Sequence, residues 1–225
     1  MVANVKPRRR YDSPRRREQA GATRRAVLEA AHALFVDRGY VATTIGAIAS
    51  KANVAPETVY AVFGSKRAIL SELVNDAITG NDAPPVLQQD WVRGLRDEPD
   101  PRRRVRALAT NGRLILERRA ALDELIRGAA AADPEMAALR QVGKSQRAAG
   151  QREILHRAFD PTDLRADVDL DTAADILYAI GSPETYRLLV VDRGWTGVRF
   201  ERWYGDALER LLLAPIPVAQ LKDGG

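Results

Sequence analysis

Apolar residues recur at helical spacing along almost the whole chain, and no run alternates convincingly with the period of two that marks a half-buried strand. The first helical series is Val27, Leu28, Ala31, Leu34 and Phe35. Hydrophobic residues make up 45% and charged residues 29% of the 225 positions, so the chain can bury a sizeable core beneath a solvated surface. The sequence therefore predicts an all-α fold.

The composition argues against several classes of protein. The chain has no cysteine, which excludes disulfides, cysteine-ligated metals and thiol nucleophiles, and its two histidines are too far apart for a histidine metal cage. No apolar run approaches the length of a membrane span, and the N-terminus is rich in arginine instead of apolar residues. We therefore expect no catalytic residues, no metal, no cofactor and no membrane partner, and a cytoplasmic, nucleoid-associated protein.

The N-terminal segment is strongly basic. Residues 1–25 hold nine Lys or Arg and two Asp or Glu, whereas residues 81–225 hold 22 and 23 and are nearly neutral. Residues 1–20 contain two arginine triplets, two prolines and few aliphatic side chains, which predicts a segment that is disordered when free. A basic arm before a near-neutral body indicates contact with a polyanion; a purely solubilising tail is the alternative.

Four helices are predicted before residue 80, from hydroxyl residues that can cap them, a proline suited to a first turn, and glycines that end them. These start and stop signals are, in chain order, Thr23, Gly39, Thr43 or Thr44, Pro56, Gly64 and Ser65.

The second and third of these helices, over residues 44–63, fit a helix-turn-helix. Its two axes cross closely, so the first helix needs a small residue, the turn needs a residue that accepts positive φ, and the second helix needs an apolar anchor. Ala49, Asn53 and Val59 meet these needs in that order. Asn serves in place of Gly because it tolerates the left-handed conformation better than most residues.

The stretch LFVDRGYVATTIGAIASKANVAPETVYAVFGSKRAIL closely resembles the DNA-binding domain of TetR-family regulators, and the resemblance spans about residues 22–72. It implies a homodimeric transcriptional repressor that binds a pseudo-palindromic double-stranded operator and whose C-terminal domain binds a small-molecule effector. It also implies that the third helix lies in the major groove. The side chains expected at DNA are Thr43, Thr44, Glu57, Thr58, Tyr60, Ala61 and Lys66.

The chain departs from the family pattern where direct reading of bases would occur. Gly46 stands where many members carry Arg, and Ala61 and Val62 replace larger residues, so the third helix has few long donors. We infer that the arm compensates by entering the minor groove or following phosphates. Its candidates are Arg8, Arg9, Arg10, Arg15, Arg16 and Arg17. A non-allosteric architectural DNA binder that uses mainly this arm is the alternative function.

Beyond residue 85 every segment again has a helical pattern. Helices are predicted over residues 86–96, from Asp100-Pro101, over 120–132, from Asp133-Pro134 to about Phe159, and from about Leu170. Gly181-Ser182-Pro183 predicts a kink or restart, and a last helix covers residues 200–212. The phrase from Ser182 to Trp195 also looks like the dimerisation helices of many family members.

Two further sets of residues are predicted in this region. The last two helices have broad apolar faces that suggest a four-helix dimer interface, formed by Leu177, Leu188, Trp203, Leu208, Leu211 and Leu212. An effector pocket would use polar or aromatic residues on apolar helix faces, namely Trp91, Asn111, Gln146, Tyr178 and Tyr186. For each pocket residue, an ordinary place in the core or interface is the alternative. For the apolar faces of the last helices, the alternative is a core formed entirely within one chain.

The predicted organisation has four parts. A disordered basic arm covers residues 1–20, and the helix-turn-helix domain covers 21–66. A helical effector-binding and dimerisation domain covers 67–215, and a flexible tail covers 216–225.

Overall fold

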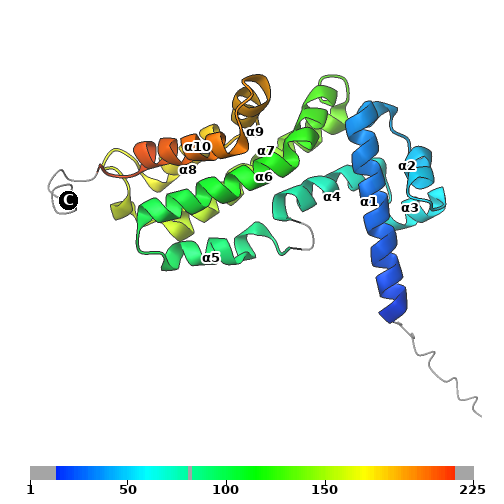
Figure 1. Ribbon diagram of the computed structural model, residues 1–225, viewed down its shortest axis with the longest axis horizontal. Coiled ribbons are helices and arrows are strands. Elements are labelled where there is room, and N and C mark those ends of the chain that lie inside the picture. The colour runs from blue at the N-terminus through cyan, green and yellow to red at the C-terminus, as the bar shows by residue number, and fades with distance from the viewer. Residues whose placement is uncertain (1–13, 81–82, 216–225) are drawn as a thin grey trace, which may run out of the picture. The chain divides into compact units, whose positions relative to one another are not determined.

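The computed structural model describes residues 14–80 and 83–215, without the side chains of 14–17, and divides the chain into two compact units (Figure 1). The first unit extends to Leu70 and the second begins at Ser71. In the described residues the regular elements are helices, with one isolated bridge between Leu164 and Leu213. The all-α prediction is confirmed.

The first unit consists of three helices and the start of a fourth. These are α1 (Pro14–Ala42), α2 (Ile45–Lys51), α3 (Pro56–Phe63) and α4 (Lys66–Thr79), which continues into the second unit. Gly39 interrupts α1 with φ 79°, and Gly64 ends α3 with φ 74°, as the sequence predicts. The core includes Val27, Ala31 and Phe35 of α1, all 0% exposed.

Residues 14–20 correct the prediction of a disordered arm over 1–20, because they form the first turns of α1. Pro14 suits a first helical position, and the Arg, Glu, Gln and Ala residues that follow are all good helix formers. Thr23 consequently lies inside α1 and is not its N-cap. The rest of the predicted arm, and the predicted tail over 216–225, lie outside the described residues.

The second unit packs long helices around a separate core. Its elements are η1 (Val86–Gln88), α5 (Asp90–Asp97), α6 (Pro101–Ala129), α7 (Pro134–Ala158), η2 (Pro161–Asp163), α8 (Leu170–Ile180), α9 (Pro183–Tyr186), the π-helical η3 (Arg187–Asp192) and α10 (Gly197–Leu212). The carboxylates of Asp100 and Asp133 cap α6 and α7 as predicted. The predicted separate helix over 120–132 is instead the end of α6.

The core of the second unit corrects half of the predicted dimer interface. Leu177 is 3% exposed, and Leu208 and Leu212 are 0% exposed, because they pack within the same chain against α6, α7 and one another. Leu188 and Leu211 are 51% and 42% exposed, and Trp203 is half-buried. Amphipathic patterning correctly marks these helices, but one chain already covers much of their apolar surface.

Candidate DNA-binding surface and effector cavity

The turn between α2 and α3 has the geometry that the sequence predicts. Ala49, the small residue expected where the two helices cross, is 1% exposed, and Asn53 is left-handed with φ 55°. The Val54 N–H donates to the Ala49 carbonyl at 3.0 Å, which closes the turn across the end of α2. The small residue lets the helices approach, and the left-handed asparagine reverses the chain within a few residues.

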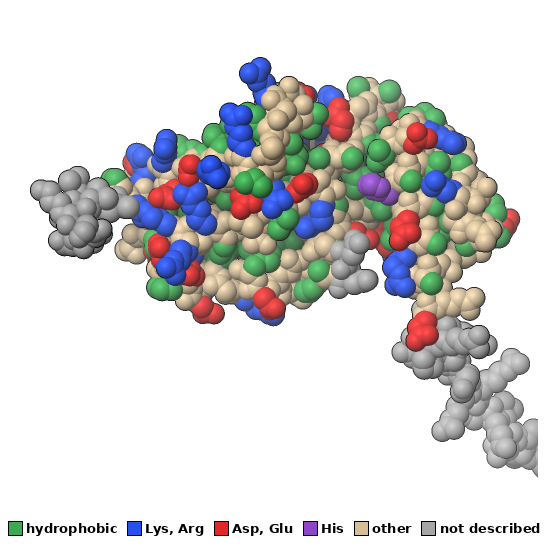
Figure 2. Space-filling view, in the orientation of Figure 1, with side chains coloured by type: hydrophobic (Ala, Val, Ile, Leu, Met, Phe, Trp, Pro, Cys, Tyr) green, Lys and Arg blue, Asp and Glu red, His purple; other side chains and the backbone are tan. Residues whose placement is uncertain are grey.

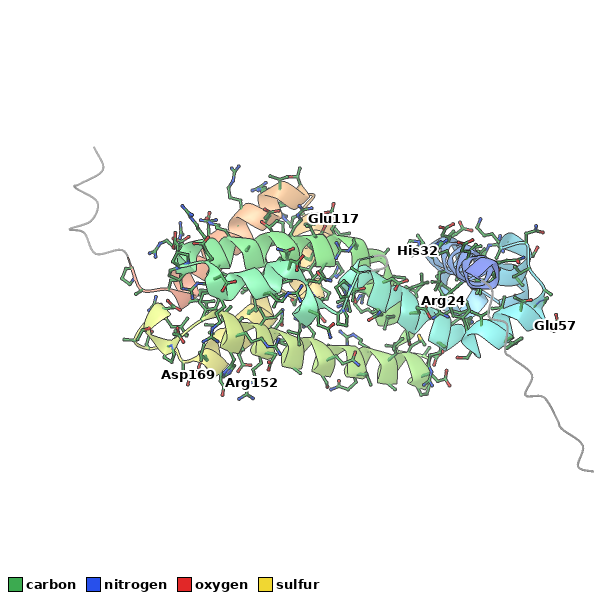
Figure 3. The ribbon with its side chains drawn as sticks, turned by 90° about the horizontal axis from the view of Figure 1, so that it is seen from below. Arg24, His32, Glu57, Glu117, Arg152 and Asp169 are labelled. Atoms are coloured by element: carbon green, nitrogen blue, oxygen red, sulfur yellow. The ribbon has the colours of Figure 1, made fainter. Side chains whose placement is uncertain are left out.

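Helix α3 has one buried and one exposed face. Val59 is 0% exposed and Phe63 9%, so they anchor the helix in the core of the first unit. Glu57, Tyr60 and Ala61 lie on the opposite, exposed face, and Tyr60 is 55% exposed. Glu57 is labelled at the outer edge of this unit in Figure 3. The predicted contact residues of α3 therefore share one accessible face, with Thr58 half-buried beside them.

The two threonines before α2 have different roles. The Thr44 hydroxyl is the N-cap and accepts from the Ala47 N–H at 3.1 Å, on an exposed surface. Thr43 is 1% exposed, and its hydroxyl donates to the carbonyls of Gly39 at 2.8 Å and Leu34 at 3.2 Å. The prediction that the Thr43 hydroxyl contacts DNA is therefore wrong in this conformation, because that group ties the end of α1 to the start of α2.

Lys66 has a structural role that the sequence does not reveal. Its Nζ donates to the carbonyls of Tyr40 and Thr43, both at 2.7 Å, and lies 4.2 Å from the centre of the Tyr40 ring. These contacts join the start of α4 to the end of α1. A phosphate contact by Lys66 stays a prediction.

The predicted arm arginines are only partly within the described residues. Arg8, Arg9 and Arg10 lie outside them, and Arg15, Arg16 and Arg17 are described only as backbone in the first turns of α1. Arg24 is a basic residue of α1 that the sequence analysis did not select. Its guanidinium lies 4.8 Å from the centre of the Phe63 ring, which links α1 to the end of α3.

The second unit contains a cavity of about 690 Å³ between α4, α6, α7 and the segment from α9 to η3. Its apolar walls come from Val74, Ile78, Leu116, Ile126, Leu139 and Val191. All of its lining residues belong to the second unit. The volume lies within the range of roughly 300–1,000 Å³ that small-molecule sites occupy.

Two of the five residues predicted for an effector pocket, Gln146 and Tyr186, line this cavity. The other three do not. The Trp91 ring N–H donates to the Gln89 side chain at 2.8 Å, and the Asn111 amide donates to the Ala107 carbonyl at 2.9 Å. Tyr178 stacks against Arg147, whose Cζ is 3.7 Å from the ring centre. A backbone carbonyl therefore satisfies the Asn111 amide, whose need for a partner made Asn111 a candidate, and the ring N–H of Trp91 also has a partner within the protein.

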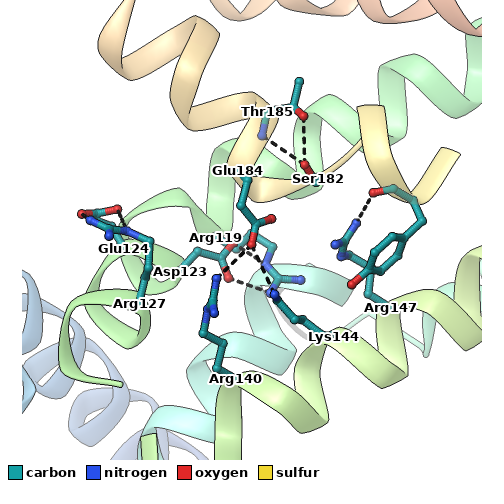
Figure 4. Close-up of polar contacts among 11 residues, drawn as sticks. Arg119, Asp123, Glu124, Arg127, Arg140, Lys144, Arg147, Ser182, Glu184 and Thr185 are labelled. Carbon is teal, nitrogen blue, oxygen red and sulfur yellow. Dashed lines mark hydrogen bonds and ion pairs between the residues drawn. The ribbon is translucent and has the colours of Figure 1, made fainter. Parts of the chain in front are cut away.

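Sequence analysis missed the charged side chains that line the cavity. Arg119 is 8% exposed and holds the carboxylate of Asp123 through two hydrogen bonds of 2.7 Å (Figure 4). Burial raises the pKa of Asp123, although the Arg119 guanidinium acts in the opposite direction. The only sequence signal is their i, i+4 spacing, which is also typical of exposed helix pairs.

The described residues contain neither a metal-binding cluster nor a membrane-spanning helix. Among residues 14–80 and 83–215, no group of three or more His, Asp or Glu is arranged to hold a metal ion. No helix in that part of the chain is both long and apolar enough to cross a membrane.

Comparison with known proteins gives a family match for the region of the helix-turn-helix. Residues 27–73 match the family model of bacterial regulatory proteins of the tetR family. The chain is also 27% identical over 180 residues to an uncharacterized HTH-type transcriptional regulator, YdeS, of Bacillus subtilis (strain 168). That alignment covers 79% of this chain and 84% of YdeS.

Solved structures share the fold at low sequence identity. SmeT is the repressor of a Stenotrophomonas maltophilia multidrug efflux pump. Its complex with triclosan has a TM-score of 0.67 and 22% identity to this chain, and the alignment covers 88% of this chain and 99% of SmeT. NalD, a secondary repressor of a Pseudomonas aeruginosa efflux pump, has a TM-score of 0.60 and 20% identity over 88% of this chain and 100% of NalD. The comparisons therefore give a tetR-family match over the helix-turn-helix, a distant relative that is an HTH-type transcriptional regulator, and solved structures that share the helical fold over most of the chain.

Proposed function

We propose that the protein is a homodimeric repressor that binds a pseudo-palindromic operator and releases it when a small molecule occupies the cavity of the second unit. The observation that carries DNA recognition is the exposed outer face of α3, with Tyr60 55% exposed opposite the buried Val59 and Phe63. A rigid helix with one free face can enter a major groove. An operator-bound regulator acts on the nucleoid in the cytoplasm.

The accessible apolar residues near the C-terminus support self-association. Leu188, Val191, Val198 and Leu211 are 51%, 64%, 66% and 42% exposed. Trp195 and Trp203 lie edge to face with ring centres 6.1 Å apart and are both half-buried. An isologous contact through α10 and η3 would cover these residues, and its two-fold symmetry would match two operator half-sites.

The cavity supports regulation by a small molecule. It combines apolar walls with a cluster of charged side chains, and apolar walls with placed polar groups are the usual chemistry of a small-molecule site. Fold neighbours have been solved with small molecules: SmeT with triclosan, and a candidate regulator from Saccharomonospora viridis with choline, at a TM-score of 0.63 and 21% identity over 87% of this chain and 100% of that chain. An effector that fits only one conformation would shift the protein away from the operator-bound state.

The first test is selection of bound sequences from a random double-stranded DNA pool at about 0.15 M salt, near physiological ionic strength. A two-fold symmetric consensus with half-sites about 34–36 Å apart supports a dimeric, sequence-specific regulator. Enrichment without any consensus would favour the architectural binder, which should also show a steep loss of affinity with salt and no preferred site.

A pair of variants then tests α3 on the selected operator. Tyr60→Phe removes only the hydroxyl, whereas Tyr60→Ala removes the whole exposed ring. If Tyr60 donates to a phosphate, both variants should weaken operator binding about tenfold to a hundredfold, because one hydrogen bond to a charged group contributes about 1.5–3 kcal/mol. Val41→Ala, at a residue 74% exposed on the same unit, is the control for surface truncation. Unchanged affinity of Tyr60→Phe would remove the hydroxyl from the contacts.

Analytical ultracentrifugation tests the dimer. The double variant Leu188→Glu/Leu211→Glu should sediment as a monomer, because it would bury two carboxylates in the proposed interface. Val142→Glu is the matched control, since Val142 is 51% exposed on α7 and outside that interface. A double variant that remains dimeric would exclude this face.

A further inference from the structure

The charged side chains in the cavity of the second unit are not balanced. Arg119, Arg140, Lys144 and Arg147 lie together there with only two carboxylates, Asp123 and Glu184 (Figure 4). The other charged lining residues form two balanced pairs, Glu124 with Arg127 and Arg187 with Asp192. The described lining therefore carries an excess of two positive charges.

Both carboxylates of this cluster are already paired with cations. Asp123 accepts both of its close bonds from Arg119. Glu184 lies 3.2 Å from Arg140 and 4.0 Å from Lys144, so one carboxylate serves two cations. Arg140 and Lys144 are a turn apart on α7, and their side chains converge on the start of α9.

Arg147 continues this row on α7 without a carboxylate of its own. Among the described residues, none places a carboxylate oxygen within 4.0 Å of its guanidinium. One Nη donates to the Tyr178 carbonyl at 2.7 Å, and the Tyr178 ring stacks against the guanidinium at 3.7 Å. These contacts fix its orientation, while burial lowers its pKa and the carboxylates of Glu184 and Asp123 act against that change. A partly desolvated cation held in this way is suited to receive an anion.

Much of the remaining cavity wall is apolar. Val74 and Ile78 of α4 and Leu116 of α6 form part of a wall that offers no hydrogen bonds. Among the lining residues Tyr186 is the one aromatic side chain, so the site lacks the cage of several rings that holds a quaternary ammonium group. The ligand that fits both regions has an apolar body and one acidic end.

From this arrangement we propose that the effector is an amphipathic carboxylate, whose acidic group binds between Arg147, Lys144 and Arg140 and whose apolar body lies along α4 and α6. This inference rests on the proposed effector function and specifies its chemistry. The ligand carboxylate offsets the excess of positive charge, and the guanidinium of Arg147 can bind it through two parallel hydrogen bonds.

Isothermal titration calorimetry on the full-length protein without DNA tests the class of ligand. The probes are dodecanoate and naphthoate, each compared with the amine and the alcohol of the same apolar body, and inorganic phosphate alone. We expect each carboxylate that binds to do so at least tenfold more tightly than its amine and its alcohol, and phosphate to bind weakly. The proposal is overturned if no carboxylate exceeds its neutral counterpart, or if phosphate binds as well as the carboxylates.

Variants with opposite expected signs separate recognition from misfolding. Arg147→Gln should weaken carboxylate binding about tenfold to a hundredfold and leave alcohol binding unchanged, because it removes one charged partner. Glu184→Gln should strengthen carboxylate binding, since it removes a competing carboxylate, and a folding defect would not produce that gain. Arg152→Gln is the control on the exposed side of α7, where Arg152 pairs with Asp171. A Glu184→Gln variant that binds carboxylates more weakly would contradict the proposal.

Operator release is measured separately. In a fluorescence anisotropy assay of the protein–operator complex, a bound carboxylate should lower operator affinity. If carboxylates bind but the operator stays bound, the proposed regulation fails and the ligand class stands. If neutral ligands release the operator and carboxylates do not bind, the regulation stands and the ligand class fails.

Discussion

The two units of this protein are both helical, but they are specified in different ways. In the first unit, the turn depends on residues a few positions apart, such as Ala49, Asn53 and Val54, whose contacts close within one turn. In the second unit, the cavity depends on side chains far apart in the sequence, such as Arg119 of α6 and Glu184 of α9. The visible face of that unit also carries interspersed basic and acidic side chains (Figure 2).

This difference has a functional consequence. A helix-turn-helix must present one helix in a fixed orientation, so small residues and positive φ are required at particular positions. A ligand cavity needs only a volume, apolar walls and a few polar groups, and many combinations of residues provide them. The first unit is therefore recognisable from sequence spacing, whereas the cavity of the second unit becomes visible only when its helices are packed together.

The largest expected effect comes from removing one core ring in each unit. Phe35 and Phe200 are both 0% exposed, so Phe35→Ala and Phe200→Ala should each lower the free energy of unfolding by about 3–5 kcal/mol. Hydrogen exchange should increase in α2 and α3 for the first variant, with loss of operator binding, and in α6 and α10 for the second. Exchange that rises equally in both units for either variant would show that they unfold as one cooperative body.

A close contact specific to the second unit gives the next effect. A Cβ at Gly181 would overlap the hydroxyl of Tyr204 and lie 2.9 Å from the Leu177 carbonyl, a backbone atom. Gly181→Ala should therefore destabilise the protein by about 3 kcal/mol, the upper range for overpacking. Gly150→Ala is the matched control, because a Cβ there meets no atom within 4 Å inside α7 and should stabilise it by about 1 kcal/mol. Thermal unfolding followed by circular dichroism measures both, and equal effects would contradict this packing.

Much of the fold could be predicted because its determinants are local. The starts of α6, α7 and α9, the turn at Asn53 and the end of α3 at Gly64 all depend on neighbouring residues. The packing partners of the apolar faces of α8 and α10 could not be predicted, because an amphipathic pattern does not distinguish a partner in the same chain from a second copy. For this reason the sequence predicts Leu208 in a dimer interface, whereas the structure buries it within one chain.

The candidate site residues differ in the same way, because some depend on local spacing and others on contacts between distant parts of the chain. Tyr60 could be placed on an exposed face, because the spacing of Val59 and Phe63 determines the opposite, buried face. The burial of Thr43 could not be predicted, since its hydroxyl bonds to carbonyls of Leu34 and Gly39 that it contacts only in the folded unit. Arg147 gave no sequence signal, because a charged residue on a helix is usually solvated.

The turn residue of the first unit gives a smaller effect. Asn53 is left-handed at φ 55°, so Asn53→Val should cost about 1–2 kcal/mol, because a branched side chain clashes in that conformation. Asn53→Gly should be tolerated, since glycine adopts positive φ readily. Urea unfolding gives the free energies, and Asn75→Val in the helical α4 controls for the change of side chain. Equal stability of Asn53→Val and Asn53→Gly would mean that the left-handed turn is not required.

The smallest effect concerns the cap of α8 and depends on pH. The Asp169 carboxylate accepts from the Thr172 N–H at 2.7 Å, and this bond lowers the pKa of Asp169 below its ordinary value of 3.8. A pKa lowered by folding means that the ionised carboxylate stabilises the folded state. That contribution is complete above the ordinary pKa and is lost as the pH falls through the lower, folded-state pKa.

Asp169→Asn separates the cap from its charge, because asparagine also caps helices well but does not titrate. Wild type and variant should differ most above pH 4, where the ionised cap also interacts favourably with the positive end of the helix dipole, and should converge at lower pH. Urea unfolding across this range measures the difference. If the difference in free energy of unfolding between wild type and variant stays constant with pH, the hydrogen bond stabilises this end of α8 without a contribution from the charge. The cap would then depend only on local hydrogen-bond geometry, as the turn at Asn53 depends on local backbone geometry.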